Sequence, residues 1–340
     1  MTPAHGEAAA PKWRPVAIGG VVMLLALFPL AGSPFYVELV AKVMILAIFA
    51  LSLELLVGRT GLVSFGHAAF FGVAAYATVL LSPRSEAASL WWLLPAAAGC
   101  AALYAALVGA LSLRTRGIYF IMVTLAFSQM AYYVFHDTKL GGGSDGIYLY
   151  VKPALAIGGR TLVDLDRPLG FYYFTLGTLA ATYAFLAMLA RSRFGHALAG
   201  IRANEQRMRA AGFSTFPYKL VAFVVAGALA GVAGVLYAVK DGFVNPEILA
   251  WHQSGTVLLM VILGGIGSWR GAVVGAFAFV VLKEAFQSEA LFGAFAKHWQ
   301  LTLGLTIIAA VALMPHGIVG VAAQLRARRA RRAEAVAHAG

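Results

Sequence analysis

The chain is poor in charge and nearly free of cysteine. Of its 340 residues, 12% are Asp, Glu, Lys or Arg, whereas soluble domains average about 25%. This composition excludes a water-soluble globule. The single cysteine, Cys100, excludes an intrachain disulfide and a cysteine-based metal cluster. The eight histidines are scattered through the chain and none is paired at metal-ligand spacing, so we expect no metal centre.

Motifs for nucleotide binding and hydrolysis are also missing. The sequence contains no G-x-x-x-x-G-K-[ST] motif, so it does not cradle ATP in a P-loop. It has no H-E-x-x-H, no G-x-S-x-G and no pair of aspartates inside an apolar segment, which leaves hydrolysis within a membrane without candidate residues. We expect a protein that is not an enzyme and binds no cofactor, and an intramembrane enzyme is the weakest alternative.

What the chain does have is long apolar segments, since 61% of its residues are hydrophobic. A helix needs about 20 apolar residues to cross a bilayer. The sequence predicts an all-α, polytopic transmembrane helical bundle of about ten spans, within a range of nine to eleven. The apolar segments are 16–32, 35–57, 61–81, 90–113, 117–136, 169–190, 219–239, 253–268, 271–288 and 299–318. The first, short and preceded by Lys12 and Arg14, would alternatively be a signal peptide.

The basic residues predict the orientation. The net charge of +12 reflects, in a membrane protein, the loops on the cytoplasmic side, and we expect no nucleic-acid partner. Ten spans that start inside place most of the 26 basic residues in the cytoplasm, together with both termini. The predicted domain organisation is a cytoplasmic segment 1–15, a transmembrane domain 16–320 with an outer loop 137–168 and a cytoplasmic loop 191–218, and a basic tail 321–340 near the lipid bilayer.

The loop 191–218 is the most charged part of the chain. At helical spacing it carries a mainly apolar stripe, and Arg202, Glu205 and Arg209 occupy another face. Gly212 is positioned to end the helix. We expect a short amphipathic helix that docks on a cytosolic motor, and a solvated connector is the alternative. The stripe consists of Ala197, Ile201, Asn204, Met208 and Ala211.

The third apolar segment is weakened as a helix by glycines, and breaks at membrane depth persist where the backbone is buried or lines a cavity. We expect the translocation path here, with Glu54 as an acidic candidate inside a span. Alternatively, His67 is a hydrogen-bonded core residue, and Glu54 snorkels to the interface or pairs with Arg59. The predicted path residues are Ser64, His67, Glu54, Thr124 and Gln129.

Small residues four apart let helices approach closely. Gly227 and Gly231 form one such pair, and Gly267, Gly271 and Gly275 form a second series. We expect both series to pack helices.

Several longer blocks then occur in order along the chain. They are GLVSFGHAAFFGVAAY from Gly61, RGIYFIMVTLAFSQM from Arg116, GGSDGI from Gly142, FGHALAGIRANEQRMRAAGF from Phe194, YKLVAFVVAGALAGVAGVLYA from Tyr218 and LLMVILGGIGSWRGAVVGAF from Leu258. With these blocks the chain resembles the permeases of branched-chain amino acid ABC importers, of the LivM type, over nearly its whole length.

The resemblance implies a multi-pass subunit of the bacterial inner membrane. Its expected partners are a sister LivH-type permease, two cytosolic ATPases that hold ATP and Mg, and a periplasmic substrate-binding protein. The stretch 201–212 resembles the coupling segment of the family, with Asn204 and Glu205 at its N-E pair. Glu54 stands where family members often have Asn, which leaves urea, amide or aromatic-acid substrates open. The competing class is an ion-coupled secondary transporter that uses Glu54 or His67 as its coupling group.

Overall fold

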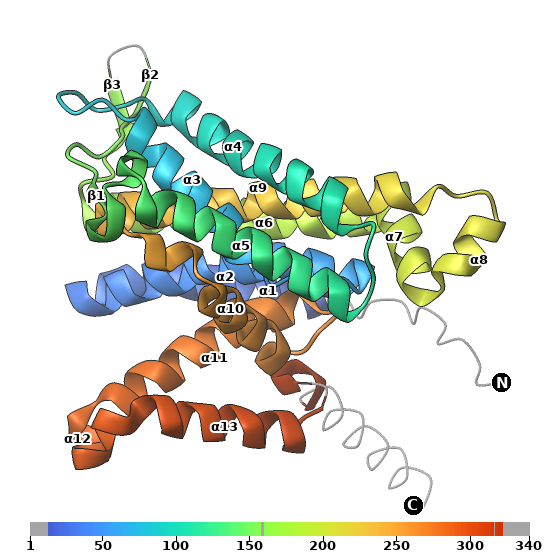
Figure 1. The fold of residues 1–340 in the computed structure, drawn as a ribbon. Coiled ribbons are helices and arrows are strands. Elements are labelled where there is room, and N and C mark those ends of the chain that lie inside the picture. Colours follow the sequence, from blue (N-terminus) through green and yellow to red (C-terminus); the bar gives the residue numbers. More distant parts are fainter. Residues whose placement is uncertain (1–12, 158–159, 316, 322–340) are drawn as a thin grey trace, which may run out of the picture.

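The computed structural model describes residues 13–157, 160–315 and 317–321, and these form a bundle in which most long helices run in a common direction (Figure 1). Each predicted apolar segment contains one long helix, so the all-α fold class is confirmed. These helices are α1 (Trp13–Ala31), α2 (Pro34–Thr60), α3 (His67–Leu81), α4 (Leu90–Ser112), α5 (Ile118–Asp137), α6 (Pro168–Arg191), α9 (Thr215–Asp241), α10 (Trp251–Gly264), α11 (Trp269–Gln287) and α13 (Trp299–Leu313).

Not every one of these helices is long and apolar enough to cross a membrane. Six stretches of the described chain are long and apolar enough to cross a bilayer: α2, α4, α5, α6, α9 and Ala296–Val321, which contains α13. A seventh span is added if α10 and α11 form one broken span, in which the chain bends by 115° at the break. The chain is therefore a polytopic helical protein, and the count of ten spans stays a prediction.

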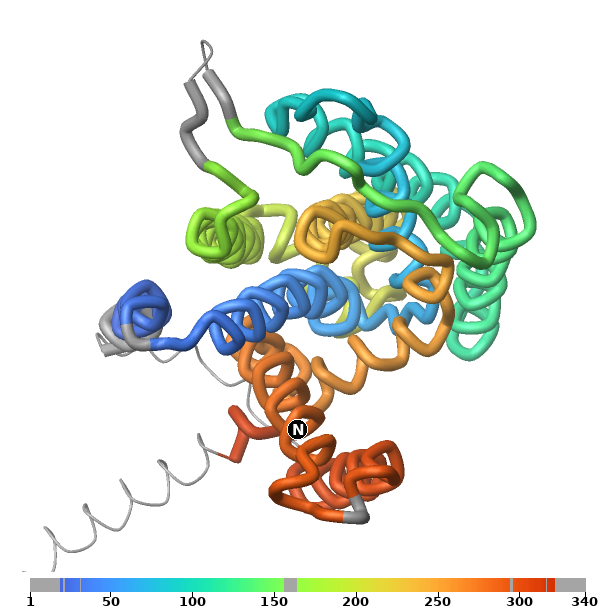
Figure 2. The backbone as a smooth tube through the Cα atoms, turned by 90° about the vertical axis from the view of Figure 1, so that its left-hand side faces the viewer, coloured from blue at the N-terminus to red at the C-terminus, as the bar shows by residue number. Residues whose placement is uncertain are grey.

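Helix α2 is the centre of the bundle. It is apolar on all sides, as a fully surrounded helix must be, and its residues from Val43 to Val57 are buried with the single exception of Leu46. Helices α6, α9, α10 and α11 pack around it, as the end-on view shows (Figure 2). Helix α1 lies at the edge, where the Tyr172 hydroxyl of α6 donates to the Leu25 carbonyl at 2.7 Å.

Glycines set the closest helix contacts. Gly227 and Gly231 of α9 face Ala105 and Ala101 of α4, and an added Cβ would press on those methyl groups. A Cβ on Gly275 of α11 would clash with the backbone of α10.

In the second glycine series, Gly267 has a different role from Gly271 and Gly275. Gly271 also lies against the backbone near Gly264, so it belongs to the same helix contact as Gly275. Gly267 lies in the turn between α10 and α11 with φ of 94°, and a Cβ there would meet only the end of the Arg202 side chain. Its role is to make the turn, and the expected helix packing by Gly267 is replaced by that role.

The bundle has two different ends. One end carries short strands and turns, and we call it the strand end. Here β1 (Ile147–Tyr148) pairs antiparallel with β4 (Phe243–Val244), and β2 (Leu155–Ile157) pairs with β3 (Arg160–Val163). The short elements η1 (Lys139–Gly141), η2 (Gly143–Asp145), α12 (Glu289–Phe292) and η4 (Gly293–His298) also lie between helices there.

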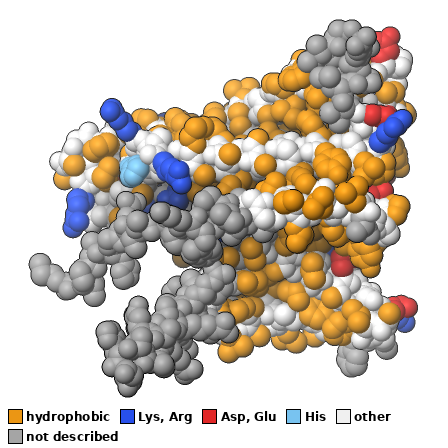
Figure 3. Space-filling view, turned by 180° about the vertical axis from the view of Figure 1, so that it is seen from behind, with side chains coloured by type: hydrophobic (Ala, Val, Ile, Leu, Met, Phe, Trp, Pro, Cys, Tyr) orange, Lys and Arg blue, Asp and Glu red, His pale blue; other side chains and the backbone are white. Residues whose placement is uncertain are grey.

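The opposite end carries α7 (Arg193–Ala203) and α8 (Glu205–Ala210), and we call it the α7–α8 end (Figure 1). In the space-filling view, Lys and Arg gather at this end, acidic side chains gather at the strand end, and an apolar belt covers the helices between them (Figure 3). The predicted basic tail 321–340, apart from its first residue, and most of the N-terminal segment 1–15 lie outside the described residues.

Candidate functional site

The chain between α2 and α3 interrupts the helical bundle. Helix α2 ends at Thr60, Gly61 is left-handed with φ of 73°, and α3 begins only at His67. The backbone N–H of Phe65 donates to Thr124 Oγ1 of α5 at 3.2 Å, and that of Ala68 donates to Ser254 Oγ of α10 at 2.9 Å. Hydroxyl groups from two other helices thus satisfy backbone groups that would otherwise be costly in an apolar interior.

A second interruption lies against the first. After α9 the chain returns into the bundle through β4 and the 3-10 turn η3 (Pro246–Leu249), and α10 begins at Trp251. Ser128 Oγ of α5 donates to the Leu249 carbonyl at 2.8 Å. The Leu249 side chain covers Gly72 of α3, where a Cβ would clash with it. Adjacent interrupted segments of this kind are where transporters form substrate and ion sites.

The structure brings three of the predicted path residues together at the first interruption. Ser64, His67 and Thr124 are all fully buried, and Ser64 Oγ accepts from the Gly66 N–H at 3.2 Å. Gln129 is only partly buried on α5. Ser64 and His67 have no exposed surface, so neither side chain lines an open passage in this conformation.

His67 is held from several sides. Its Nε2 lies 2.8 Å from Ser52 Oγ of α2, its ring stacks on Phe49 at 5.6 Å between centroids, and Phe70 meets it edge-on. Its Nδ1 has no hydrogen-bond partner among the described residues. Sequence reasoning missed Ser52 and Ser254, because a serine in an apolar segment gives no signal of which distant backbone group it meets.

Glu54 does not pair with Arg59. Its Oε1 accepts from the Gly267 N–H at 2.7 Å, in the turn between α10 and α11, and its carboxylate covers Gly58. Arg59 lies over the Trp269 ring, 5.2 Å from the centroid. Arg202 of α7 donates to the Gly58 carbonyl. The alternative Glu54–Arg59 pair is thus replaced by a backbone contact, and Glu54 and Arg202 join α2, α7 and the α10–α11 turn at the α7–α8 end.

The segment expected as one helix from 201 to 212 is two helices. Asn204 is extended, with φ of −162° and ψ of 101°, and its side-chain oxygen accepts from the Arg207 N–H at 2.9 Å. Asn is among the strongest N-cap residues, and here it ends α7 and starts α8. Ile201 is buried and Met208 folds back on Gly200, so the predicted apolar stripe does not form one docking face.

Glu205 anchors α8 to the start of α9. Its Oε1 accepts hydrogen bonds from Arg209 at 2.6 Å, Thr215 at 2.8 Å and Lys219 at 2.9 Å. Desolvation raises the pKa of Glu205, but the hydrogen bonds from Lys219 and Thr215 and the charge of Lys219 outweigh it and bring the pKa to about 2. Gly212 follows in the left-handed region with φ of 86° and redirects the chain into α9.

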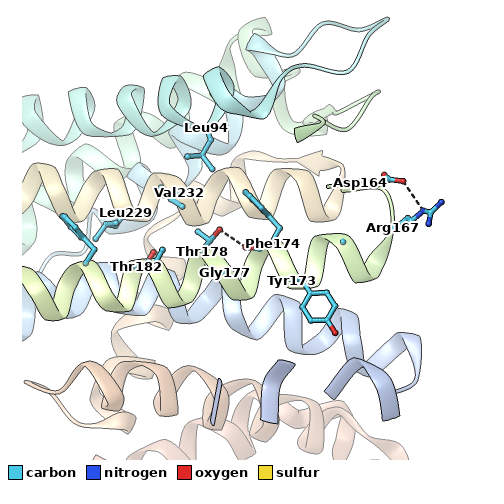
Figure 4. Close-up of a pocket in the computed structure, with 13 residues that line it drawn as sticks. Leu94, Asp164, Arg167, Tyr173, Phe174, Gly177, Thr178, Thr182, Leu229 and Val232 are labelled. Carbon is cyan, nitrogen blue, oxygen red and sulfur yellow. Dashed lines mark hydrogen bonds and ion pairs between the residues drawn. The ribbon is translucent and has the colours of Figure 1, made fainter. Parts of the chain in front are cut away.

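A groove between α4, α6 and α9 has a different character (Figure 4). Its volume is about 910 Å³, and Leu94, Phe174 and Leu229 are among its apolar lining residues. The Thr178 hydroxyl in it already donates to the Phe174 carbonyl. At its mouth Arg167 Nε lies 3.3 Å from Asp164 Oδ2. Such a lining suits hydrocarbon and offers little to a polar solute.

Comparisons with known proteins give a consistent picture. The family model described as branched-chain amino acid transport system / permease component matches residues 35–311. The chain is 29% identical to the high-affinity branched-chain amino acid transport system permease protein LivM of Escherichia coli K12, over 88% of this chain and 73% of that protein. It is 25% identical to the LivH permease protein of the same strain, over 81% of this chain and 91% of that protein. No solved structure shows significant similarity to the chain.

Proposed function

Because the chain belongs to the family of branched-chain amino acid transport system permease components, we propose that it is a membrane-spanning subunit of an ATP-driven importer for branched-chain amino acids. The observation that carries the proposal is the extent of the family match. Residues 35–311 include both interruptions of the bundle and the α7–α8 segment. Urea, amide and aromatic-acid importers stay as alternative substrate classes.

The α7–α8 end is the proposed cytoplasmic end. Basic side chains gather there (Figure 3), as the positive-inside rule requires for a bacterial inner-membrane protein. Near it, Phe213, between α8 and α9, and Phe216, in the first turn of α9, expose 41% and 38% of their surface. Two partner ATPases with ATP and Mg would dock here, and the residues Ile201, Arg202, Asn204, Glu205, Met208, Arg209 and Gly212 would form and support the coupling element.

The strand end is then the side that receives substrate from a periplasmic binding protein. A sister LivH-type subunit would cover part of the apolar flank, since α5 and the stretch Ala296–Val321 bury only 22% and 12% of their most apolar windows within this chain. Substrate would cross by alternating access, in which movement at the interruptions opens a route past Ser64 and His67.

The function is tested by reconstituting the whole importer in proteoliposomes and measuring leucine uptake. Uptake should require ATP and an intact ATPase, and it should persist when a protonophore is added at constant ATP. Uptake that continues without ATP and collapses with the protonophore would instead establish the secondary transporter.

The orientation has a separate test. In a Cys100→Ser background, the variants Ser144→Cys at the strand end and Ala211→Cys at the α7–α8 end place one exposed thiol each. An impermeant thiol reagent added outside intact spheroplasts should label position 144 and spare position 211. Labelling of both positions from outside would contradict the proposed topology.

A further inference from the structure

A polar and aromatic cluster lies where the second interruption meets α5. Glu247 of η3 is at its centre, Tyr132 and His136 come from α5, and Trp251 and His252 come from the start of α10. We call these five residues the Glu247 cluster. His252 Nε2 lies 3.7 Å from Glu247 Oε2, and η3, which carries Glu247, packs against α5, which carries Tyr132 and His136.

The side chains of the cluster are exposed or partly exposed at the surface of the described chain. The side chains of Glu247 and His252 are 59% and 50% exposed, and half of Trp251 is exposed. An exposed acid, imidazole and aromatic ring together can meet both the charged and the apolar parts of a small solute.

Further polar residues lie next to the cluster on both α5 and α10. Tyr132 and His136 stack at 5.2 Å, and Gln129 precedes Tyr132 by three residues on the same face of α5. On α10, Thr256 follows His252 by one turn and donates to its carbonyl at 2.9 Å. Polar groups therefore continue from the cluster by about one turn along both helices.

The contacts within the cluster contribute little to the stability of the fold. The distance between His252 and Glu247 exceeds that of a hydrogen bond, and a pair of this exposure contributes about 0–1 kcal/mol to stability. The join between η3 and α5 is made instead by Ser128 and the Leu249 carbonyl. The Glu247 carboxylate is thus available to a ligand.

We propose that the Glu247 cluster is the entry site for the substrate on the strand end of the permease, and that it binds a zwitterionic α-amino acid. The proposal rests on the proposed function as an importer. The Glu247 carboxylate receives the ammonium group of the substrate. The imidazole of His252 is a donor for the substrate carboxylate, and the Trp251 ring contacts its apolar side chain. His136, whose Nδ1 lies 2.7 Å from Asp137 Oδ1, supports the site by stacking on Tyr132.

The test uses the assembled importer with its binding protein in proteoliposomes and radiolabelled L-leucine as the probe. Glu247→Gln keeps the shape and removes the charge that holds the ammonium group. We expect a rise of at least tenfold in the apparent KM for leucine-loaded binding protein, which corresponds to about 1.4 kcal/mol. Glu247→Asp should recover part of the loss. The matched control is Glu86→Gln, which removes an exposed charge from the loop between α3 and α4 and should leave uptake unchanged.

Three outcomes would overturn the assignment. A wild-type KM in Glu247→Gln would show that the carboxylate does not contact substrate. An equal loss in Glu86→Gln would show a general effect of charge at this end. Failure of Glu247→Gln to co-purify with the sister subunit would make Glu247 an assembly residue. The wild-type importer separates this test from the proposed function, since absence of ATP-dependent leucine uptake there refutes the function whatever the variants do.

Discussion

Replacing Glu205 by glutamine should release α8 from α9 while the bundle stays folded. The carboxylate receives hydrogen bonds from Arg209, Thr215 and Lys219, and Lys219 is only 7% exposed. Removing one partner of a buried ion pair costs about 3–5 kcal/mol. The Glu205 side chain is 25% exposed, so water recovers part of this and we expect about 2 kcal/mol, or roughly a 30-fold larger undocked fraction of α8.

The release would be local because α8 cannot persist alone. Helices shorter than about 12 residues are marginal in water, and α8 spans only Glu205–Ala210. In the reconstituted importer, Glu205→Gln should abolish most of the substrate-stimulated ATP hydrolysis, and a nitroxide at Ala210 should become more mobile. Arg207→Gln is the matched control, because Arg207 is exposed and contacts Asn204 through its backbone N–H.

A double variant refutes or supports the reasoning. Lys219→Met in the Glu205→Gln background removes the buried charge that was left unpaired, so part of the docking should return. If the double variant is no better than Glu205→Gln, or if Glu205→Gln keeps both wild-type coupling and a rigid α8, the ion pair is not what holds the coupling element.

Three further outcomes are expected. Glu205 has its pKa lowered to about 2, so its stabilising effect is fully present above its usual value of 4.5 and is lost as pH falls from there toward 2; the mobility of a nitroxide on α8 should rise in that window and not near neutral pH. Gly275→Ala should lower thermal stability by about 1–3 kcal/mol through overpacking against α10, whereas Gly177→Ala, which meets nothing within 4 Å, should change stability little in the same melting assay. Ser254→Ala should cost about 1–3 kcal/mol in that assay because the Ala68 N–H loses its acceptor, and an unchanged melting temperature would show that water replaces the hydroxyl.

The helices were predictable from the sequence because apolar length is a local property. Each of the ten segments contains a helix, and the glycines around position 61 predicted the irregular start of the third. The break at Asn204 was not predicted, because the stripe from Ala197 to Ala211 keeps helical spacing across it. What ends α7 is a side-chain cap by Asn204 on Arg207, which periodicity does not detect.

The sites depended on contacts between distant parts of the chain. Glu54 carried a local signal, as an acid in an apolar run, but its partner is the backbone of Gly267, which sequence cannot specify. The sequence did not indicate that Tyr132 and Glu247 lie close together, because they are far apart along the chain. They lie on α5 and η3, which pack together only because the chain returns into the bundle after α9. The one local hint was that the carboxylate of Glu247 is followed within five residues by Trp251 and His252.

The tight contact between α10 and α11 also bears on how the chain enters the membrane. Helix α10 spans Trp251–Gly264, and at about 1.5 Å per residue it covers roughly 21 Å, well short of the 30 Å hydrocarbon layer. It is therefore a poor independent insertion unit. Gly271 and Gly275 bring α11 against its backbone with no side chain between them, so the two helices form a natural hairpin for the translocon to release together. Membrane insertion of this region then depends on glycines, which add little to the hydrophobicity of the segment.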